Sequence, residues 1–194
     1  MADDGAGTAR ESLERARCGD PLAFAALVRG HQRMVYSLAL RMLSDRHEAQ
    51  DVAQEAFMQL HRCLSIIQSG SHLVFWLRKV TTHLAIDRLR RGGRHEALPV
   101  DCEPEIAESN DDPLLQRQMR GLVAALAPDA RAVVLLRYQE DLDPTEIAEM
   151  LDMSINTVKS HLRRSLVELR KKFQDCSVMN SAAAALSADE GRDS

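Results

Sequence analysis

The chain has 194 residues, with 25 Lys and Arg against 29 Asp and Glu, so its formal net charge is −4. Hydrophobic residues make up 45% and charged residues 28%, a balance that is ordinary for globular proteins and excludes wholesale disorder. Aromatic residues are only 4%, and 9 Gly and 6 Pro are too few to favour a turn-rich all-β fold. The four cysteines are at least 39 residues apart, so neither a disulfide framework nor a structural zinc site is expected.

The sequence also argues against a membrane protein and against an enzyme. Its start, MADDGAGTARESLERAR, carries acids and no apolar core, which is unlike a signal peptide. No apolar run approaches the roughly 18 residues of a membrane-spanning helix. None of the 7 His residues lies in an HExxH motif, and no P-loop or GxSxG occurs. We expect a cytoplasmic protein with reduced thiols, no membrane insertion, no catalytic residue, no cofactor and no metal.

Charge is unevenly distributed along the chain. Residues 78–95 and residues 156–172 each carry six Lys or Arg and a single acid. Residues 101–112 and residues 140–152 each carry six acids. Two basic segments separated by acidic ones indicate two anion-binding surfaces, with two solvated helix faces as the alternative.

The first half of the chain predicts three amphipathic helices, preceded by a flexible N-terminus over residues 1–20. Asp20-Pro21 is a typical N-cap and first helical residue for the first of them. Ser44-Asp45 separates this helix from the second. The third runs from His72 to about Arg91, before Gly92-Gly93. Together these helices predict one small domain over residues 21–95.

The second half predicts another helical domain, over residues 113–174. Residues 96–112 are acidic, contain two prolines and lack periodicity, which indicates a flexible linker. A coil of that length spans roughly 23 Å on average, enough for two domains to occupy separate sites of one large partner. Residues 175–194 lack an amphipathic stripe and are expected to form a flexible tail. The predicted fold class is all-α: two small helical domains joined by a flexible acidic linker, the second a helix-turn-helix.

The helix-turn-helix prediction depends on TEIAEMLDMSINTVKSHLRRSL, residues 145–166. Asp143 and Glu146 predict a capping box at its start, and Ser154 is a typical N-cap for its second helix. A buried stripe that includes Val158 and Leu166 leaves a polar, basic face outward, suited to a DNA groove. The alternative is a core helix with a charged solvent side. The candidate DNA-binding residues are Ser154, Asn156, Thr157, Lys159, Ser160, Arg163 and Arg164.

A second constellation lies in HLVFWLRKVTTHLAIDRLRR, residues 72–91. Trp76, Lys79, His83 and Arg90 recur at helical spacing and share a face, with Arg78 and Thr82 beside it. Cations can meet phosphates while the ring stacks on an unpaired base, a contact worth roughly 1–3 kcal/mol per base. The alternative, that the chain's single Trp is a core anchor, stays open.

The third segment, DVAQEAFMQLHR at residues 51–62, presents acids, amides and Met58 on its outer face. The residues alone do not separate a solvated face from a protein-binding face.

In this order, DVAQEAFMQLHR, FWLRKVTTHLAIDRLRR and LRYQEDLDPTEIAEMLDMSINTVKSHLRRSL resemble the signature segments of bacterial sigma-70 factors, most closely the two-domain extracytoplasmic-function (ECF) group. The resemblance covers residues 21–95 and 113–174. It implies an RNA polymerase sigma factor that directs transcription initiation from promoter DNA, duplex and single-stranded. The first domain is then similar to sigma region 2 and the second to sigma region 4.

The resemblance also implies roles for residues. The clamp of core polymerase would bind Asp51, Gln54, Glu55, Met58 and Gln59, and the second domain would meet the flap. The helix-turn-helix would read the −35 element. The −10 element would be melted and held by Gln68, Ser69, Gly70, Ser71, His72, Trp76, Arg78, Lys79, Thr82, His83, Arg88, Arg90 and Arg91. An anti-sigma factor is a further candidate partner.

Three departures from the family pattern accompany this resemblance. His83 stands where Asn is frequent, and Thr82 where a base is common. The loop at residues 68–72 lacks the frequent acidic-glycine pattern, which leaves its base preference open. Asp152 replaces a usual Gly in the turn, but Asp tolerates the left-handed conformation.

Two alternatives remain at this point. A stand-alone helix-turn-helix regulator would explain the second domain and would bind duplex DNA without polymerase, but it leaves the Trp76 helix without a role. An enzyme is the other alternative, and no motif in the sequence favours it.

Overall fold

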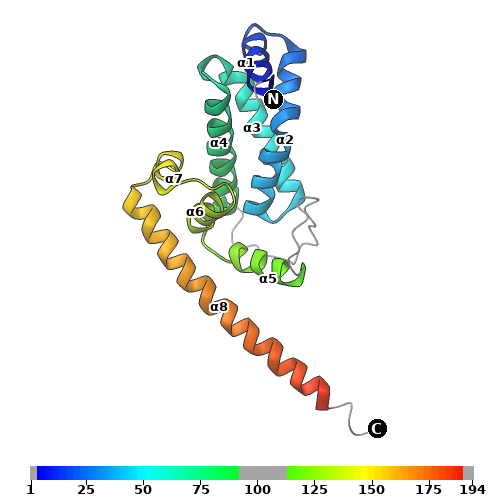
Figure 1. Cartoon of the computed structure of the whole chain (residues 1–194), viewed down its shortest axis with the longest axis vertical. Helices are drawn as coiled ribbons and strands as arrows, with labels where there is room; N and C mark the ends of the chain where they lie inside the picture. The colour runs from blue at the N-terminus through cyan, green and yellow to red at the C-terminus, as the bar shows by residue number, and fades with distance from the viewer. Residues whose placement is uncertain (1–3, 92–112, 190–194) are drawn as a thin grey trace.

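The computed structural model describes residues 4–91 and 113–189, with side chains described for residues 11–91 and 114–174. These residues form helices joined by short turns, which confirms the all-α prediction (Figure 1). The α-helices and one 3₁₀ helix are α1 (Asp4–Arg17), α2 (Pro21–Leu43), α3 (Arg46–Cys63), η1 (Leu64–Ile66), α4 (Gly70–Arg91), α5 (Pro113–Ala124), α6 (Pro128–Tyr138), α7 (Pro144–Met150) and α8 (Ile155–Asp189).

Helices α1 to α4 pack as one bundle whose boundaries follow local sequence signals. The carboxylate of Asp20 accepts hydrogen bonds from the backbone N–H groups of Leu22 and Ala23, and Pro21 is the first residue of α2. Ser44 ends α2 with a φ of 57°, and Asp45 caps α3 by accepting from Glu48 N. The interior of the bundle is apolar and includes Leu27, Val35, Leu60, Leu73 and Leu77.

The N-terminal segment differs from its prediction, because α1 is a helix where flexible chain was expected. Leu13 and Ala16 of α1 are buried against the bundle. Arg15 forms an ion pair with Asp20 at 2.7 Å, and Arg17 Nε donates to the carbonyl of Leu64. Two buried apolar residues, Leu13 and Ala16, are too few for a helical periodicity to be recognised in the sequence.

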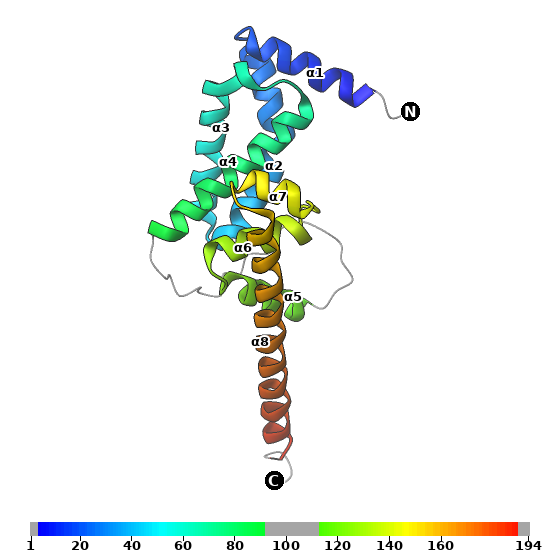
Figure 2. The same ribbon diagram turned by 90° about the vertical axis from the view of Figure 1, so that its left-hand side faces the viewer.

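The second half contains α5, α6 and α7 and the long helix α8, which extends away from the rest of the molecule (Figures 1 and 2). Helix α8 continues to Asp189, so the expected flexible tail is helical over most of its length. Its four consecutive alanines are strong helix formers, which accounts for a helix without an amphipathic stripe. The linker expected at residues 96–112 lies outside the described residues.

The two halves share one hydrophobic core. Leu38 and Met42 of α2, with Ala85 and Ile86 of α4, are buried together with residues of α6, α7 and α8. The contributing side chains of the second half are Ala132, Val133, Leu135, Leu136, Leu142, Ile147, Ala148, Met150, Leu151 and Val158. Figure 2 shows α6 lying against α4 and α2, and α7 lying against α4. The sequence did not predict this packing between the halves.

Among the helices of the described residues, none is both long enough and apolar enough to cross a membrane.

Candidate nucleic-acid interface

Helices α7 and α8 form the predicted helix-turn-helix. The capping box is present: Asp143 Oδ1 accepts from the N–H groups of Thr145 and Glu146, and Asp143 N donates to Glu146 Oε2 at 2.8 Å. Those backbone hydrogen bonds, from Glu146 first and then Thr145, lower the pKa of the Asp143 carboxyl. Ile147, Ala148 and Val158 are buried where the two helices cross.

The turn between these helices is fixed by Asp152 and Ser154. Asp152 has a φ of 54°, the left-handed conformation expected where Asp replaces Gly. Ser154 Oγ accepts from Thr157 N at 3.1 Å and lies 2.8 Å from Thr157 Oγ1, so Ser154 is the N-cap of α8. Ser154 and Thr157 are both exposed, and their hydroxyls form the cap that fixes the start of α8.

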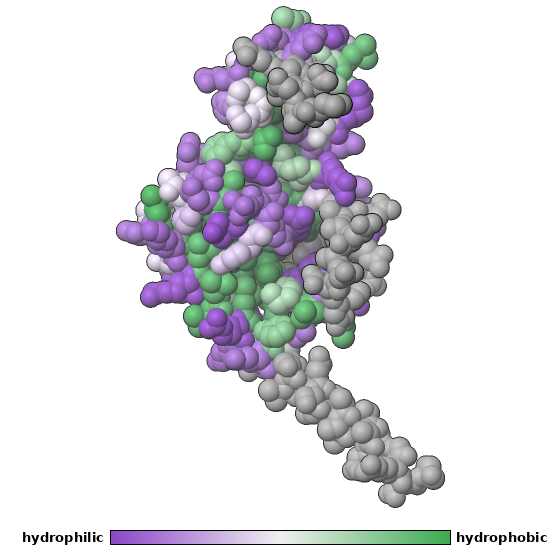
Figure 3. Space-filling view, viewed as in Figure 1, coloured by the Kyte–Doolittle hydropathy of each residue, from purple (hydrophilic) through white to green (hydrophobic). Residues whose placement is uncertain are grey.

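The outer face of α8 is polar and open to solvent. Asn156, Lys159, Arg163 and Arg164 are exposed and Ser160 is half-buried, while Arg164 Nε donates to the carbonyl of Ser160. The predicted buried stripe is wrong at Ile155, which is 40% exposed, and at Leu166, which is 43% exposed, whereas Ser165 is buried. With Val167 and with Leu114, Leu115 and Met119 of α5, Leu166 belongs to the exposed hydrophobic side chains of the second half. Hydrophobic residues indeed reach the surface over α5 and α8 (Figure 3).

The second constellation, on α4, lies against the helix-turn-helix. Lys79 Nζ donates to Asp152 Oδ1 at 2.9 Å and to the carbonyl of Glu149 at 3.2 Å. His83 Nδ1 donates to the carbonyl of Lys79, and its Nε2 lies 3.7 Å from Asp152 Oδ2. The hydrogen bond from Lys79, then its charge and that of His83, lower the pKa of Asp152.

A hollow of about 630 Å³ opens beside these contacts. Trp76 lines it together with Lys79, His83 and Asp152. The ring of Trp76 is half-buried and also touches the core of the α1–α4 bundle. The core-anchor and stacking interpretations therefore both have a structural basis, since Trp76 packs against the core and also lines the hollow.

Two further bases of α4 pair with acids of the second half. Arg78 Nε donates to Glu140 Oε2 at 2.8 Å, and Arg41 of α2 reaches Glu140 Oε1 at 3.4 Å. The Glu140 side chain is only 8% exposed. Arg90 Nη2 contacts both carboxylate oxygens of Asp129, at 2.7 and 3.0 Å.

The remaining α4 candidates are not on one surface. Arg88 points to the other side of the helix, where it pairs with Glu48 at 2.6 Å and lies 3.7 Å from Asp51. Arg91 Nε donates to the carbonyl of Asp87. Thr82 is fully buried in this arrangement of the chain, which corrects its placement on an exposed DNA-contacting face.

The loop before α4 is shorter than expected, because α4 begins at Gly70. Only Gln68 and Ser69 precede the helix, and Ser69 Oγ accepts from His72 N at 3.1 Å as its cap. Gln68 N donates to His72 Nδ1 at 3.2 Å, and the hydroxyls of Ser69 and Ser71 lie 2.9 Å apart. The loop and the first turn of α4 thus form one hydrogen-bonded unit.

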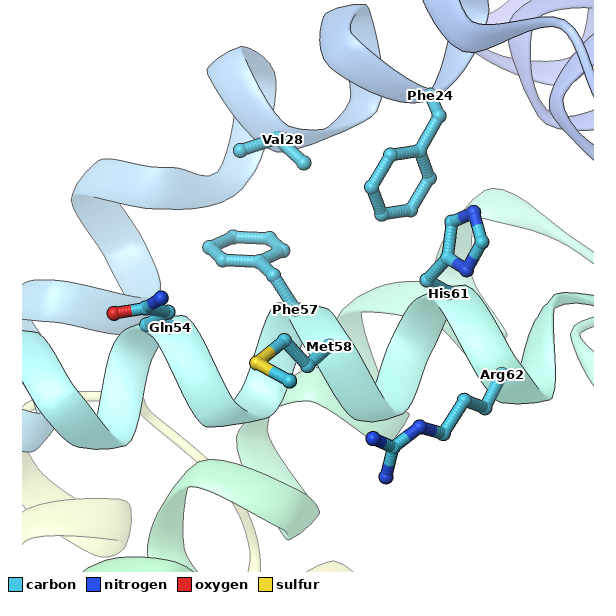
Figure 4. A pocket seen from close by; sticks show the side chains of 7 residues that line it. All are labelled: Phe24, Val28, Gln54, Phe57, Met58, His61 and Arg62. Carbon is cyan, nitrogen blue, oxygen red and sulfur yellow. The ribbon is translucent and has the colours of Figure 1, made fainter.

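The outer face of α3 borders an apolar groove of about 510 Å³ between α2 and α3 (Figure 4). Gln54 and Met58, both exposed, belong to the predicted protein-binding set. Gln59 donates to Glu55, and Asp51 lies near Arg88. The sequence did not single out the other lining residues, although their spacing on α2 and α3 is helical: Phe24, Val28, Phe57, His61 and Arg62. Phe24 and His61 meet edge to face, with ring centroids 4.9 Å apart.

In the described part of the chain, no group of three or more His, Cys, Asp or Glu residues could hold a metal ion.

Comparison with known proteins identifies the family of this chain. Residues 27–95 match the model for sigma-70 region 2, and residues 116–169 match the model for sigma-70 region 4. The chain is 30% identical over 177 residues to the ECF RNA polymerase sigma-E factor of Escherichia coli K12, covering 84% of this chain and 92% of that protein. The chain belongs to the sigma-70 family, in the ECF group.

One further relative agrees with this membership, and one solved structure shares the fold. The ECF RNA polymerase sigma factor SigE of Mycolicibacterium smegmatis is 36% identical over 152 residues, which cover 74% of this sigma factor and 59% of that longer protein. The sigma factor RpoE of Bartonella quintana, solved in complex with the anti-sigma factor NepR, has the same fold, with a TM-score of 0.61 at 18% identity over 78% of this chain and 96% of that one.

Proposed function

We propose that this ECF sigma factor binds core RNA polymerase and directs it to promoters by reading the −35 element with α8 and melting the −10 element with α4. One observation carries this proposal: one chain holds, in family order, an exposed basic recognition helix and a separate helix on which Trp76 stands among cations. A regulator that reads only duplex DNA has no use for the second surface.

The −35 element is assigned to the outer face of α8. Its basic and amide side chains lie in the N-terminal half of the recognition helix, the part that enters a major groove in helix-turn-helix proteins. Arg163 and Arg164 can contact phosphates or guanine edges, and Asn156 can pair with an adenine edge.

The −10 element is assigned to α4 and the loop before it. Lys79, Arg78 and Arg90 supply charge for the phosphates, and Trp76 supplies a ring on which an unpaired base can stack. His83 lies on the same face and adds a further hydrogen-bonding group. We assign to the loop residues Gln68 and Ser69 the capture of a flipped base, whose unstacking costs a few kcal/mol.

Core polymerase is assigned to α3 and to the apolar surface of the second half. Met58 and Gln54 line the groove between α2 and α3, which is suited to a helical partner of the clamp. The exposed hydrophobic side chains of α5 and α8 are suited to the flap. We also propose that the protein acts in the cytoplasm, that the nucleotide chemistry belongs to the polymerase, and that an anti-sigma factor can bind it, as NepR binds the Bartonella relative.

Co-elution with core polymerase on gel filtration tests the docking surface. The wild-type chain should co-elute, and Met58→Glu should weaken the complex because it places a charge in the apolar groove. Leu22→Glu is the matched control, since Leu22 is an exposed apolar residue of α2 that does not line the groove. Equal retention of both variants would contradict this placement of the clamp surface.

Gel shifts with and without core polymerase separate the proposal from a stand-alone helix-turn-helix regulator. Sequence-specific retardation of promoter DNA should require polymerase. Equally specific and equally tight retardation by the chain alone would favour the regulator.

A further inference from the structure

The cationic face of α4 is occupied by carboxylates of the chain's own second half. We propose that Glu140, Asp152 and Asp129 stand in for DNA phosphates on this face, so that the free sigma factor masks its own −10 surface. This inference rests on the proposed function of α4 and concerns the regulation of that surface.

The pairing matches acid to base along the helix. Each of the bases assigned to the −10 strand on this side of α4 meets a carboxylate: Arg78 with Glu140, Lys79 with Asp152, and Arg90 with Asp129. The distances of 2.7 to 2.9 Å are those of charge-assisted hydrogen bonds. A phosphate would use the same donors, so the acids and a DNA strand compete for them.

Glu140 shows that the arrangement is a built interface rather than a set of surface pairs. Its carboxylate is nearly enclosed and is shared between Arg78 and Arg41, one from each of two helices of the first half. Exposed ion pairs contribute little to stability, whereas a desolvated carboxylate between two guanidinium groups requires its partners to stay in place.

Apolar packing and a buried arginine also hold the second half against the first. Leu38, Met42, Ala85 and Ile86 of the first half share one core with apolar residues of the second half, where α6 packs on α2 and α4 and α7 packs on α4. Arg131 of α6 reaches across to donate to the carbonyl of Met42 at 2.5 Å. The acids are therefore held against α4 by a shared core and not only by their charge.

The masking is selective. Asn156, Lys159, Arg163 and Arg164 of α8 stay exposed in this arrangement, whereas Lys79 is paired with Asp152 beside the hollow that Trp76 lines. It follows that α7 must leave α4 before an unpaired strand can use the cations and the ring. Separation of the two halves on core polymerase would expose the −10 surface where melting is needed.

Trp76 provides a direct reporter, because it is the only tryptophan of the chain. The opening variant is Asp129→Asn, Glu140→Gln and Asp152→Asn together. The control is Glu11→Gln, Asp141→Asn and Glu168→Gln, three exposed acids outside the interface whose neutralisation gives the same net charge. The measurements are acrylamide quenching of Trp76 fluorescence and anisotropy of a labelled 20-nucleotide single-stranded DNA pool of random sequence, with the full chain and without polymerase.

Acrylamide should quench the Trp76 fluorescence of the opening variant more strongly than that of the wild type or the control. Because the open state is a minor population of the wild type under this proposal, the opening variant should also bind the DNA about tenfold more tightly. Quenching and affinity equal to the control would overturn the masking. Circular dichroism checks that each variant is folded.

A charge swap tests the same interface without depending on the triple variant. Arg41→Glu together with Arg78→Glu should increase quenching because both repel Glu140, and Glu140→Arg added to them should reverse the increase. No reversal would count against the interface. Promoter-directed transcription with core polymerase is scored separately: if the wild type directs none, the proposed function fails whatever the quenching shows.

Discussion

Lys79 of α4 donates a hydrogen bond to Asp152, 73 residues further along the chain, in the turn that leads into the recognition helix. This contact joins the two elements to which the two promoter contacts are assigned. Asp152 stands at a position where Gly is usual, and it has two roles. Its backbone adopts the left-handed conformation of the turn, and its carboxylate pairs with Lys79 of α4.

The recognition helix gives the first prediction. Replacing Arg163 and Arg164 with Ala should weaken binding of the −35 element, by about 1–3 kcal/mol for each side chain that contacts a base. Competition gel shifts with holoenzyme and promoters that differ only in this element measure the loss.

Arg170→Ala with Lys171→Ala is the matched control, because both residues are exposed on the same helix but lie outside the helix-turn-helix. Unchanged promoter choice in the Arg163 and Arg164 variant would show that another face of α8 reads the DNA.

Trp76 gives the second prediction. Trp76→Ala should slow promoter opening more than it weakens the initial duplex complex, since stacking of one base is worth roughly 1–3 kcal/mol and forms only once the strand is unpaired. Trp76→Phe keeps a ring and should retain part of the opening. Permanganate reactivity of unpaired thymines measures opening, and a footprint identical to wild type for Trp76→Ala would leave the residue with packing alone.

Arg131 gives a prediction for stability. Its guanidinium is buried, which lowers its pKa, and it donates to the carbonyls of Met42, Ala124 and Leu126. Arg131→Met should lower the free energy of unfolding by about 3 kcal/mol, because buried carbonyls lose their donors. Urea denaturation measures this, with the exposed Arg170→Met as control. An equal effect of the two changes would mean that Arg131 does not hold the halves together.

The capping box predicts a pH dependence. Hydrogen bonds from Glu146 N and Thr145 N lower the pKa of the Asp143 carboxyl, so its contribution to stability is present above the unfolded-state value and is lost as the pH falls through the folded-state value. The Tm of the wild type should therefore fall in acid more steeply than that of Asp143→Asn. Asp141→Asn, with the same charge change two residues away, should keep the wild-type slope.

Local features of the fold were predictable because neighbouring residues determine them. Asp20-Pro21, Asp143 with Glu146, and Asp152 each fix a cap or a turn within a few residues, and each behaves in the structure as its sequence indicates. Helix α1 was missed because, among its residues with described side chains (11–17), Leu13 and Ala16 are the only buried apolar ones.

The packing between the halves could not be read from periodicity. Leu38 and Met42 continue the apolar stripe of α2, and nothing in that stripe distinguishes residues that face the bundle from residues that face α6. Thr82 shows the same limit, because a polar residue three positions from Lys79 is expected to be exposed, yet it is fully buried in the folded chain. Contacts between distant segments require the folded chain.

The most direct test of the central claim is to map the 5′ ends of transcripts made from a genomic DNA library by core polymerase with and without this protein. The account predicts a restricted set of new start sites, each preceded by a common pair of −35 and −10 sequences and lost when either sequence is altered. Start sites that are the same with and without the protein would contradict it.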